Sequence, residues 1–153
     1  MELELSYRKA RSADLQAIVN LLSDDILGKS REDISNKLNT NYIKDFNAID
    51  SDPNQYLMVV ILQQEIIGTC HLTMLPSLTF QGSLRMQIEA VRVSNKYRGL
   101  NAGKFMIKKA LEYAKNQGVK IVQLTTDKKR DRIIKFYNSL GFKHTHIGMK
   151  MFL

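Results

Sequence analysis

The chain has 153 residues, of which 44% are hydrophobic and 25% charged, values typical of one soluble globular domain. Lys and Arg number 23 against 15 Asp and Glu, so the formal net charge is +8, which favours an anionic partner without identifying it. With only 8 Gly and 2 Pro, the composition excludes collagen-like, linker-like and disordered proteins.

Local features narrow the class further. The longest uninterrupted apolar run, Tyr56–Leu62, is far shorter than the roughly 20 residues that span a bilayer, so we expect no membrane partner. The first five residues are acidic and alternating, unlike a signal peptide, and the single cysteine, Cys70, can form no disulfide within the chain. Cys70 has no neighbouring pattern of metal ligands and is interpreted as a buried structural residue. We therefore expect a cytoplasmic protein without a metal.

Hydrophobic periodicity and turn residues predict the elements. In chain order these are a strand over 2–7, a helix from Ser12, a helix from Ser30 to a turn at 50–54, strands over 56–62, 66–75 and 85–93, a helix over 105–115, a strand over 119–126, a helix over 133–140, and a strand or strand pair over 142–152. This order, β-α-α-β-β-β-α-β-α-β, predicts a single mixed α/β domain over 1–153.

The strand over 85–93 is predicted to be central. Met86, Ile88 and Ala90 lie opposite Gln87 and Glu89 in its alternating pattern. From Ala90 onward both faces carry apolar residues, which is typical of a strand covered on both sides.

The segment after this strand is the most informative for function. A loop of small residues leads into the start of a helix, where unpaired N–H groups and the positive end of the helix dipole attract phosphate. Gly99, Ala102 and Gly103 leave room for close approach to the backbone, and Lys104 adds positive charge. Arg98 either closes over an anion or braces the loop. The alternative is a tight strand–helix turn with no ligand.

Two motifs carry a resemblance to a known family. The loop Arg98-Gly99-Leu100-Asn101-Ala102-Gly103 resembles the Arg/Gln-x-x-Gly-x-Gly/Ala loop of the GNAT superfamily of N-acetyltransferases. Downstream, Phe136-Tyr137-Asn138-Ser139-Leu140-Gly141-Phe142 resembles that family's Phe-Tyr-x-x-Leu-Gly-Phe segment. The order of the elements agrees over nearly the whole chain.

The resemblance implies the GNAT fold, in which helices flank a central, mixed, mostly antiparallel and twisted sheet. It also implies acetyl-CoA as co-substrate. The residues implied to bind its pyrophosphate through the loop are Arg98, Gly99, Leu100, Asn101, Ala102, Gly103 and Lys104. The backbone of Val91 and Val93 is implied to bond the pantetheine arm.

The sequence departs from the family pattern at two positions. Asn101 stands at the family's first loop glycine, and Asn tolerates left-handed backbone geometry better than other non-glycine residues. Arg130 stands where many members have an asparagine that contacts the cofactor. The cations of 128–132 either face the phosphates of CoA or form a solvated loop.

The family chemistry needs a group that accepts a proton from an amine and one that protonates the departing thiolate. The resemblance points to Glu89 for the first role and Tyr137 for the second. The alternatives are a structural carboxylate that pairs with an arginine, and an aromatic residue of the core. His71, like the two histidines near the C-terminus, is a weaker candidate for catalysis.

The implied reaction is acetyl transfer to a primary amine of an unidentified small molecule or peptide, by direct attack in a ternary complex. The alternative is a non-catalytic GNAT-fold module that binds acyl-CoA or docks a partner. The first two helices hold acidic residues that either face a cationic amine or are solvated: Asp24, Asp25, Glu32 and Asp33. Basic residues are scattered, so we expect no nucleic-acid partner. A homodimer is common in the family but is not predicted by the residues.

Overall fold

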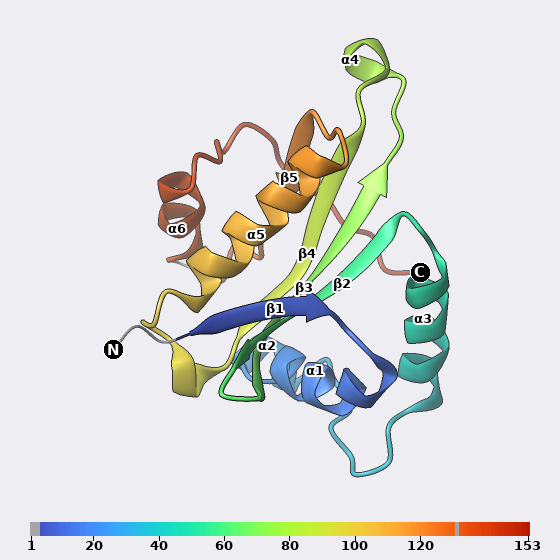
Figure 1. Ribbon diagram of the computed structural model, residues 1–153, viewed down its shortest axis with the longest axis vertical. Coiled ribbons are helices and arrows are strands. Elements are labelled where there is room, and N and C mark those ends of the chain that lie inside the picture. Colours follow the sequence, from blue (N-terminus) through green and yellow to red (C-terminus); the bar gives the residue numbers. More distant parts are fainter. Residues whose placement is uncertain (1–3, 131) are drawn as a thin grey trace. The chain divides into compact units, whose positions relative to one another are not determined.

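The computed structural model describes residues 4–130 and 132–153 (Figure 1). The predicted start of the first strand at Glu2 and Leu3 and the loop residue Asp131 lie outside the described residues. By internal contacts the chain divides into two compact units, Met1–Gln123 and Leu124–Leu153. A single domain over 1–153 stays a prediction. Within the described residues, no helix has both the length and the apolar character to cross a membrane.

The first unit is built on a five-stranded sheet in the order β1-β2-β3-β4-β5. The strands are β1 (Leu5–Lys9), β2 (Gln55–Leu62), β3 (Glu65–Leu75), β4 (Arg85–Val93) and β5 (Ile121–Leu124); the helices are α1 (Leu15–Leu22), α2 (Ile26–Lys29), α3 (Thr40–Ser51), α4 (Thr79–Gly82) and α5 (Ala102–Asn116), with short 3-10 turns η1 (Ser12–Asp14) and η2 (Asn95–Tyr97). β1 to β4 pair antiparallel, and α5 links β4 to β5 as the crossover that parallel strands need. The predicted mixed, mostly antiparallel sheet flanked by helices is confirmed.

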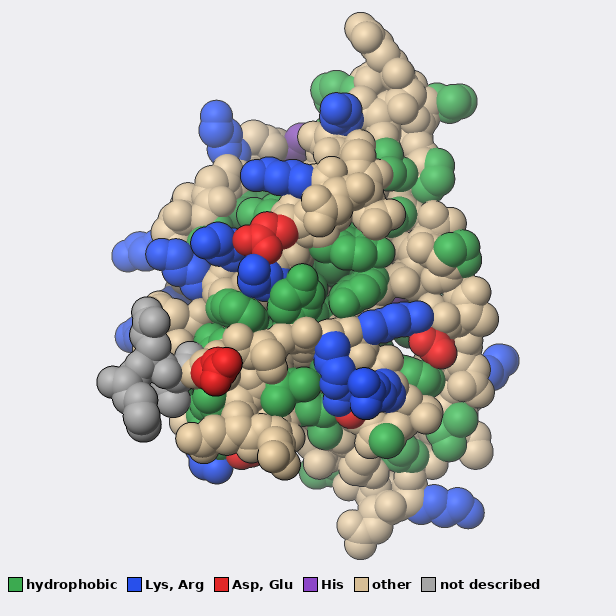
Figure 2. Space-filling model, in the orientation of Figure 1, with side chains coloured by type: hydrophobic (Ala, Val, Ile, Leu, Met, Phe, Trp, Pro, Cys, Tyr) green, Lys and Arg blue, Asp and Glu red, His purple; other side chains and the backbone are tan. Residues whose placement is uncertain are grey.

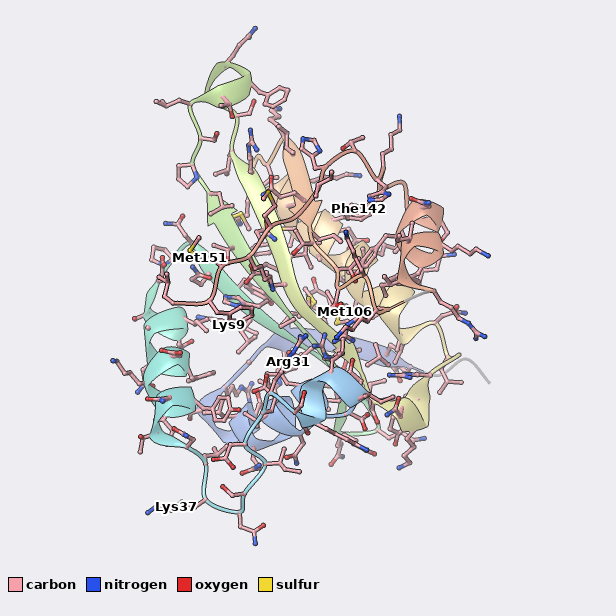
Figure 3. The ribbon with its side chains drawn as sticks, turned by 180° about the vertical axis from the view of Figure 1, so that it is seen from behind. Lys9, Arg31, Lys37, Met106, Phe142 and Met151 are labelled. Atoms are coloured by element: carbon pink, nitrogen blue, oxygen red, sulfur yellow. The ribbon has the colours of Figure 1, made fainter. Side chains whose placement is uncertain are left out.

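Helices cover both faces of this sheet (Figures 1 and 3). We call the side covered by α5 the α5 face; its fully buried side chains include Met58, Cys70, Leu72, Met86, Ile88, Met106 and Ile107. The opposite side is the α1/α3 face, where the core residues are Leu15, Ile18, Val19, Phe46, Leu57 and Val59. The interpretation of Cys70 as a buried residue is confirmed, and burial raises the pKa of its thiol to about 12.

β4 has the predicted bounds but contains a β-bulge that the alternating pattern does not reveal. The register against β3 shifts between Thr69 and His71, and Ala90 has a left-handed φ of 50°. The extra residue interrupts the alternation, so Ala90 is exposed instead of following Ile88 on the α5 face. Beyond the bulge Arg92 pairs with Thr69, which places it on the α1/α3 face.

The predicted start of the first helix is displaced. Arg11, not Ser12, is the N-cap residue of η1, and its N–H donates to the Asp14 carboxylate over 2.7 Å. α1 itself starts at Leu15. The carboxylate of Asp14, three residues after the N-cap, therefore satisfies a backbone N–H at the start of η1.

The second predicted helix is wrong over its first ten residues. α2 ends at Lys29, and α3 starts only at Thr40, after an irregular segment that contains Lys37 (Figure 3). The Asp33 carboxylate accepts the N–H of Ser35 over 3.1 Å and so closes a local turn within the predicted helix.

The second unit contains α6 (Ile133–Ser139), close to its predicted bounds, and no regular strand among its described residues after Leu124. The strand or strand pair predicted over 142–152 is therefore wrong. A strand needs a neighbour to satisfy its backbone N–H and C=O groups, and no described segment of this unit pairs with 142–152. Apolar residues within this range, such as Ile147 and Met149, are exposed. β5 is likewise shorter than the predicted 119–126.

Candidate active site

The end of β4, η2 and the start of α5 form a continuous junction in the first unit. It contains Val91 and Val93 at the half-buried end of β4, and after them all seven loop residues from Arg98 to Lys104. These are the residues that the sequence grouped as a cofactor site, apart from Arg130. The structure brings them together because they are continuous in the chain.

The backbone of the junction exposes the start of α5. Asn101 is the N-cap residue of α5, with a left-handed φ of 60°, and Gly99 has a φ of 83°. The carbonyl of Asn101 accepts the N–H of Phe105, so the amides of the three residues between them have no carbonyl of the helix to bond. The expectation that Asn101 tolerates left-handed geometry is confirmed.

This arrangement fits a diphosphate. A Cβ on Gly99 would meet no atom within 4 Å, so the approach to the loop is open. Arg98 and Lys104 are both exposed cations next to the amides. Amides at the positive end of a 15-residue helix, together with two cations, form a donor set suited to phosphate.

A polar tether joins the junction to the far end of α1. Asp24 accepts the backbone N–H of Asn95 over 2.7 Å and its side-chain amide over 3.0 Å. The backbone carbonyl of Asp24 accepts the same amide. The segment after α1 therefore holds the start of η2 in place.

The other three acidic residues between the helices are also engaged locally. Asp25 caps α2 by accepting the N–H of Gly28 over 2.6 Å, and Glu32 accepts the hydroxyl of Tyr42 over 2.5 Å. With Asp33 in its turn, none of the four acidic side chains is simply solvated, and each has a structural partner.

A cavity of about 130 Å³ lies on the α1/α3 face. Apolar side chains of α1, α3 and β2 form most of its lining, namely Leu15, Ile18, Val19, Leu22, Phe46, Ile49 and Leu57. The remaining lining comes from Ala90 at the bulge, from Thr69 and His71 of β3, and from Tyr42 and Asp45 of α3. The cavity therefore combines an apolar wall with a few polar groups, as small-molecule sites do.

Glu89 lies on the same face, directly opposite His71 in the β3–β4 pair. Its side chain is exposed, whereas His71 is half-buried. Burial lowers the pKa of His71, and the negative charge of Glu89 partly offsets this effect. Arg85, a structural partner considered for Glu89, donates to Gln123 over 3.3 Å and to Thr79.

His71 belongs to a polar cluster formed by side chains of β2 and β3. Its Nε2 lies 2.6 Å from Oε1 of Gln55, which also accepts the hydroxyl of Thr73 over 2.8 Å. No local pattern reveals this cluster, because it depends on the register between β2 and β3. Gln87, next to it on β4, accepts the side-chain amide of Gln123 over 2.8 Å.

Two predicted site residues, Arg130 and Tyr137, belong to the second unit. The backbone N–H of Arg130 donates to the carbonyl of Asp127 in a turn before α6. Tyr137 is only 7% exposed, and its ring makes edge contacts with Phe136 and Phe142 at centroid distances of 5.1 and 5.6 Å. Within its unit Tyr137 is thus a packed aromatic residue.

Part of the excess positive charge lies over the end of β1, where Figure 2 shows Lys and Arg side chains together. Arg8 forms an ion pair of 2.6 Å with Asp14, and Lys9 forms one of 2.8 Å with Asp50. Both cations are therefore used in structural pairs. Among the residues described, no cluster of three His, Cys, Asp or Glu side chains is arranged to hold a metal.

Comparisons with known proteins show the family to which the chain is similar. A family model described as acetyltransferase (GNAT) family matches residues 15–142. The crystal structure of a transcriptional regulator from Bacillus halodurans shows 40% sequence identity and a TM-score of 0.96, over 98% of this chain and 100% of that chain. The structure of an acetyltransferase from Trypanosoma brucei shows 25% identity and a TM-score of 0.79, over 98% of this chain and 100% of that one.

A sequence relative gives a similar result over a shorter region. An uncharacterized N-acetyltransferase from Methanocaldococcus jannaschii is 36% identical over 61 residues, which are 40% of this chain. The match covers 27% of that relative, so the chain spans about a quarter of its length.

Proposed function

Since the chain belongs to the acetyltransferase (GNAT) family, we propose that it is an acyltransferase that moves the acetyl group of acetyl-CoA to a primary amine. The acceptor is an amine of a small molecule or a peptide, which attacks directly while both substrates are bound. The observation that carries the proposal is the junction between β4 and α5. Its open amides, left-handed Asn101 and exposed cations suit the pyrophosphate of CoA.

Different residues of the first unit bind different parts of acetyl-CoA in the proposal. The loop from Arg98 to Lys104 binds the phosphates, and the backbone of Val91 and Val93 bonds the pantetheine arm. Bound acetyl-CoA supplies the activated acetyl thioester. Holding an amine against that carbonyl turns a bimolecular reaction into an effectively unimolecular one.

Two side chains handle protons in the proposal. Glu89 is the general base, because a carboxylate beside the cavity can accept a proton from a cationic amine. Tyr137 is the donor to the thiolate, since it occupies the matching position of the family motif and a phenol with an ordinary pKa of about 10 is protonated at neutral pH. Arg130 adds a cation for the phosphates of CoA.

Calorimetry with acetyl-CoA tests the cofactor site. We expect binding by the natural chain and by Asn101→Gly, which adopts left-handed geometry freely. Asn101→Val should weaken binding about tenfold or more, because a β-branched residue resists a φ of 60°. Absence of binding at millimolar acetyl-CoA by the natural chain would overturn the proposal.

Thiol release over a panel of amines tests catalysis. With the best amine, Glu89→Gln should lower kcat by about 10²-fold to 10⁴-fold. Glu112→Gln is the matched control, since Glu112 lies on α5 and pairs with Lys109 over 2.8 Å. Loss of the same size in both variants would contradict a catalytic role for Glu89.

The second candidate is a non-catalytic module that binds acyl-CoA for regulation. It is favoured by the relative from Bacillus halodurans, which is named a transcriptional regulator and is 40% identical over 98% of this chain. The same assays separate the two functions. A regulatory module binds acetyl-CoA in the calorimeter but releases no thiol with any amine.

A further inference from the structure

A titratable side chain that the proposed reaction does not use lines the cavity on the α1/α3 face. His71 stands between Gln55 on β2 and Glu89 on β4, and it is half-buried. Its ring has two nitrogens, and their roles follow from their hydrogen-bond partners.

The partners of Gln55 fix its orientation. Its side-chain amide nitrogen donates toward Oδ2 of Asp52 over 3.5 Å, and its Oε1 accepts the hydroxyl of Thr73. The flipped amide would place Oε1 against the Asp52 carboxylate, which is repulsive. Gln55 therefore presents an oxygen to His71.

An amide oxygen can only accept, so Nε2 of His71 must carry the hydrogen in the 2.6 Å contact. The neutral ring then has its lone pair on Nδ1. Burial lowers the pKa of His71, which keeps the ring neutral at pH 7. Asp52, through Gln55, thus selects the tautomer in which Nδ1 accepts a proton.

The charged groups around His71 are two carboxylates and one cation. Glu89 faces it from β4, Asp45 and Tyr42 line the same cavity from α3, and Arg92 pairs with the neighbouring Thr69. α1 contributes only apolar side chains to the cavity. An amine carried by an apolar group would match this lining, with its charge toward Glu89 and Asp45.

Resting on the proposed function, we propose that Nδ1 of His71 takes the proton from the acceptor ammonium and hands it to Glu89. The N–H bond of the ammonium breaks, an N–H bond forms at Nδ1, and the ring becomes an imidazolium opposite the Glu89 carboxylate. Glu89 then accepts the proton and releases it to solvent, to which it is exposed.

The acetyl transfer itself involves the amine nitrogen, the acetyl carbon and the sulfur of CoA. The freed amine lone pair forms the bond to the acetyl carbon, and the carbon–sulfur bond breaks. The thiolate takes its proton from Tyr137 and leaves as CoA thiol, and the second proton of the amine restores the phenol of Tyr137. One ammonium and one thioester thus yield one amide, one thiol and one released proton.

The tautomer can be tested without catalysis. The chain has three histidines, so a long-range ¹H–¹⁵N correlation of the full chain separates their rings, and His71→Gln identifies the signal of His71. We expect a protonated Nε2 and an unprotonated Nδ1, titrating below 6.5. A protonated Nδ1 in the neutral ring would overturn the inference.

The pH dependence of kcat/KM with the best amine tests the role. The natural chain should lose activity as pH falls through the lowered pKa of His71. His71→Gln should lack that limb and lose about 10²-fold in kcat with unchanged affinity for acetyl-CoA. His146→Gln changes an exposed histidine, and this variant should keep the natural kcat and the natural loss of activity at low pH.

A second variant separates catalysis from folding. Gln55→Glu keeps an acceptor for Nε2 but adds a negative charge, so the limb should move to higher pH by about one unit. If the natural chain is active but the fall of kcat/KM at low pH stays at the same pH in His71→Gln and Gln55→Glu, the role of His71 is overturned. A natural chain that acetylates no amine would instead overturn the proposed function.

Discussion

The two faces of the sheet use the same strands in different ways. On the α5 face Met58, Leu72 and Ile88 are 0%, 0% and 1% exposed. On the α1/α3 face the neighbouring positions of β3 and β4 hold His71 and Glu89, beside a cavity of about 130 Å³. Because side chains alternate along a strand, one backbone supports a filled core on one side and a hollow with polar groups on the other.

The difference indicates how stability and function are divided. Apolar burial contributes about 25 cal/mol per Å², so the α5 face supplies much of the folding free energy. The α1/α3 face leaves part of that contribution unused, and polar contacts help to hold its helices: the Arg8–Asp14 pair at the start of α1 and the Asp24–Asn95 tether at its end.

The largest effect should come from one substitution made on both faces. Leu72→Ala on the α5 face should lower the free energy of unfolding by about 2–5 kcal/mol, because it leaves a void among fully buried side chains. Leu22→Ala should lower it by about 1 kcal/mol, since Leu22 is half-buried and already borders the cavity. Urea unfolding of the two variants measures both values.

Equal losses of unfolding free energy in the two variants would contradict the difference between the faces. They would mean that the wall of the cavity is packed as tightly as the α5 face. A smaller loss for Leu72→Ala would reverse it.

An intermediate effect should appear at the start of α1. Arg8 and the N–H of Arg11 hold the pKa of the Asp14 carboxyl below its usual 3.8, with the hydrogen bond from Arg8 as the largest cause. A lowered pKa stabilises the fold above pH 3.8, and this stabilisation is lost as pH falls through the lower folded value. Asp14→Asn should cost about 1.5 kcal/mol at pH 7.

Thermal unfolding from pH 7 to pH 2 checks this prediction. The gap between the natural chain and Asp14→Asn should start to narrow as pH approaches 3.8 and should close only below the lowered pKa of folded Asp14, where both side chains are uncharged. Asp50→Asn is the control, because the pair of Asp50 with Lys9 is exposed and contributes little. A gap that persists at low pH would show that Asp14 acts through packing rather than charge.

The sequence predicted the fold best where pattern and turn chemistry agree. β4 has its predicted bounds, and α6 lies close to the range predicted for it. The prediction failed where a local hydrogen bond or a partner distant in sequence determines the secondary structure of a segment. Asp33 closes a turn that interrupts a helical pattern, and the segment over 142–152 pairs with no strand among the described residues.

The site divides in the same way. The loop from Arg98 to Lys104 was predictable because its backbone amides are consecutive in the chain. The cavity was not, because it joins β3 and β4 to helices far away in sequence. His71 meets Gln55 and Glu89 only through the registers of β2, β3 and β4, which no single segment specifies.

The smallest effect concerns the bulge that separates the two faces along β4. Ala90 has a φ of 50°, which costs an alanine more than a glycine. Ala90→Gly should therefore stabilise the fold slightly, by up to about 1 kcal/mol, although glycine elsewhere in a strand destabilises. Ala48→Gly, at an exposed position of α3, is the control and should cost about 1 kcal/mol. If the two variants change the free energy of unfolding in opposite directions, Ala90 has the left-handed backbone of the bulge, which separates the two faces along β4. A loss of 1 kcal/mol or more in both variants would mean that β4 runs straight through Ala90. Arg92 would then point toward the α5 face, and the bulge in β4 would not determine which side chains line the α1/α3 face.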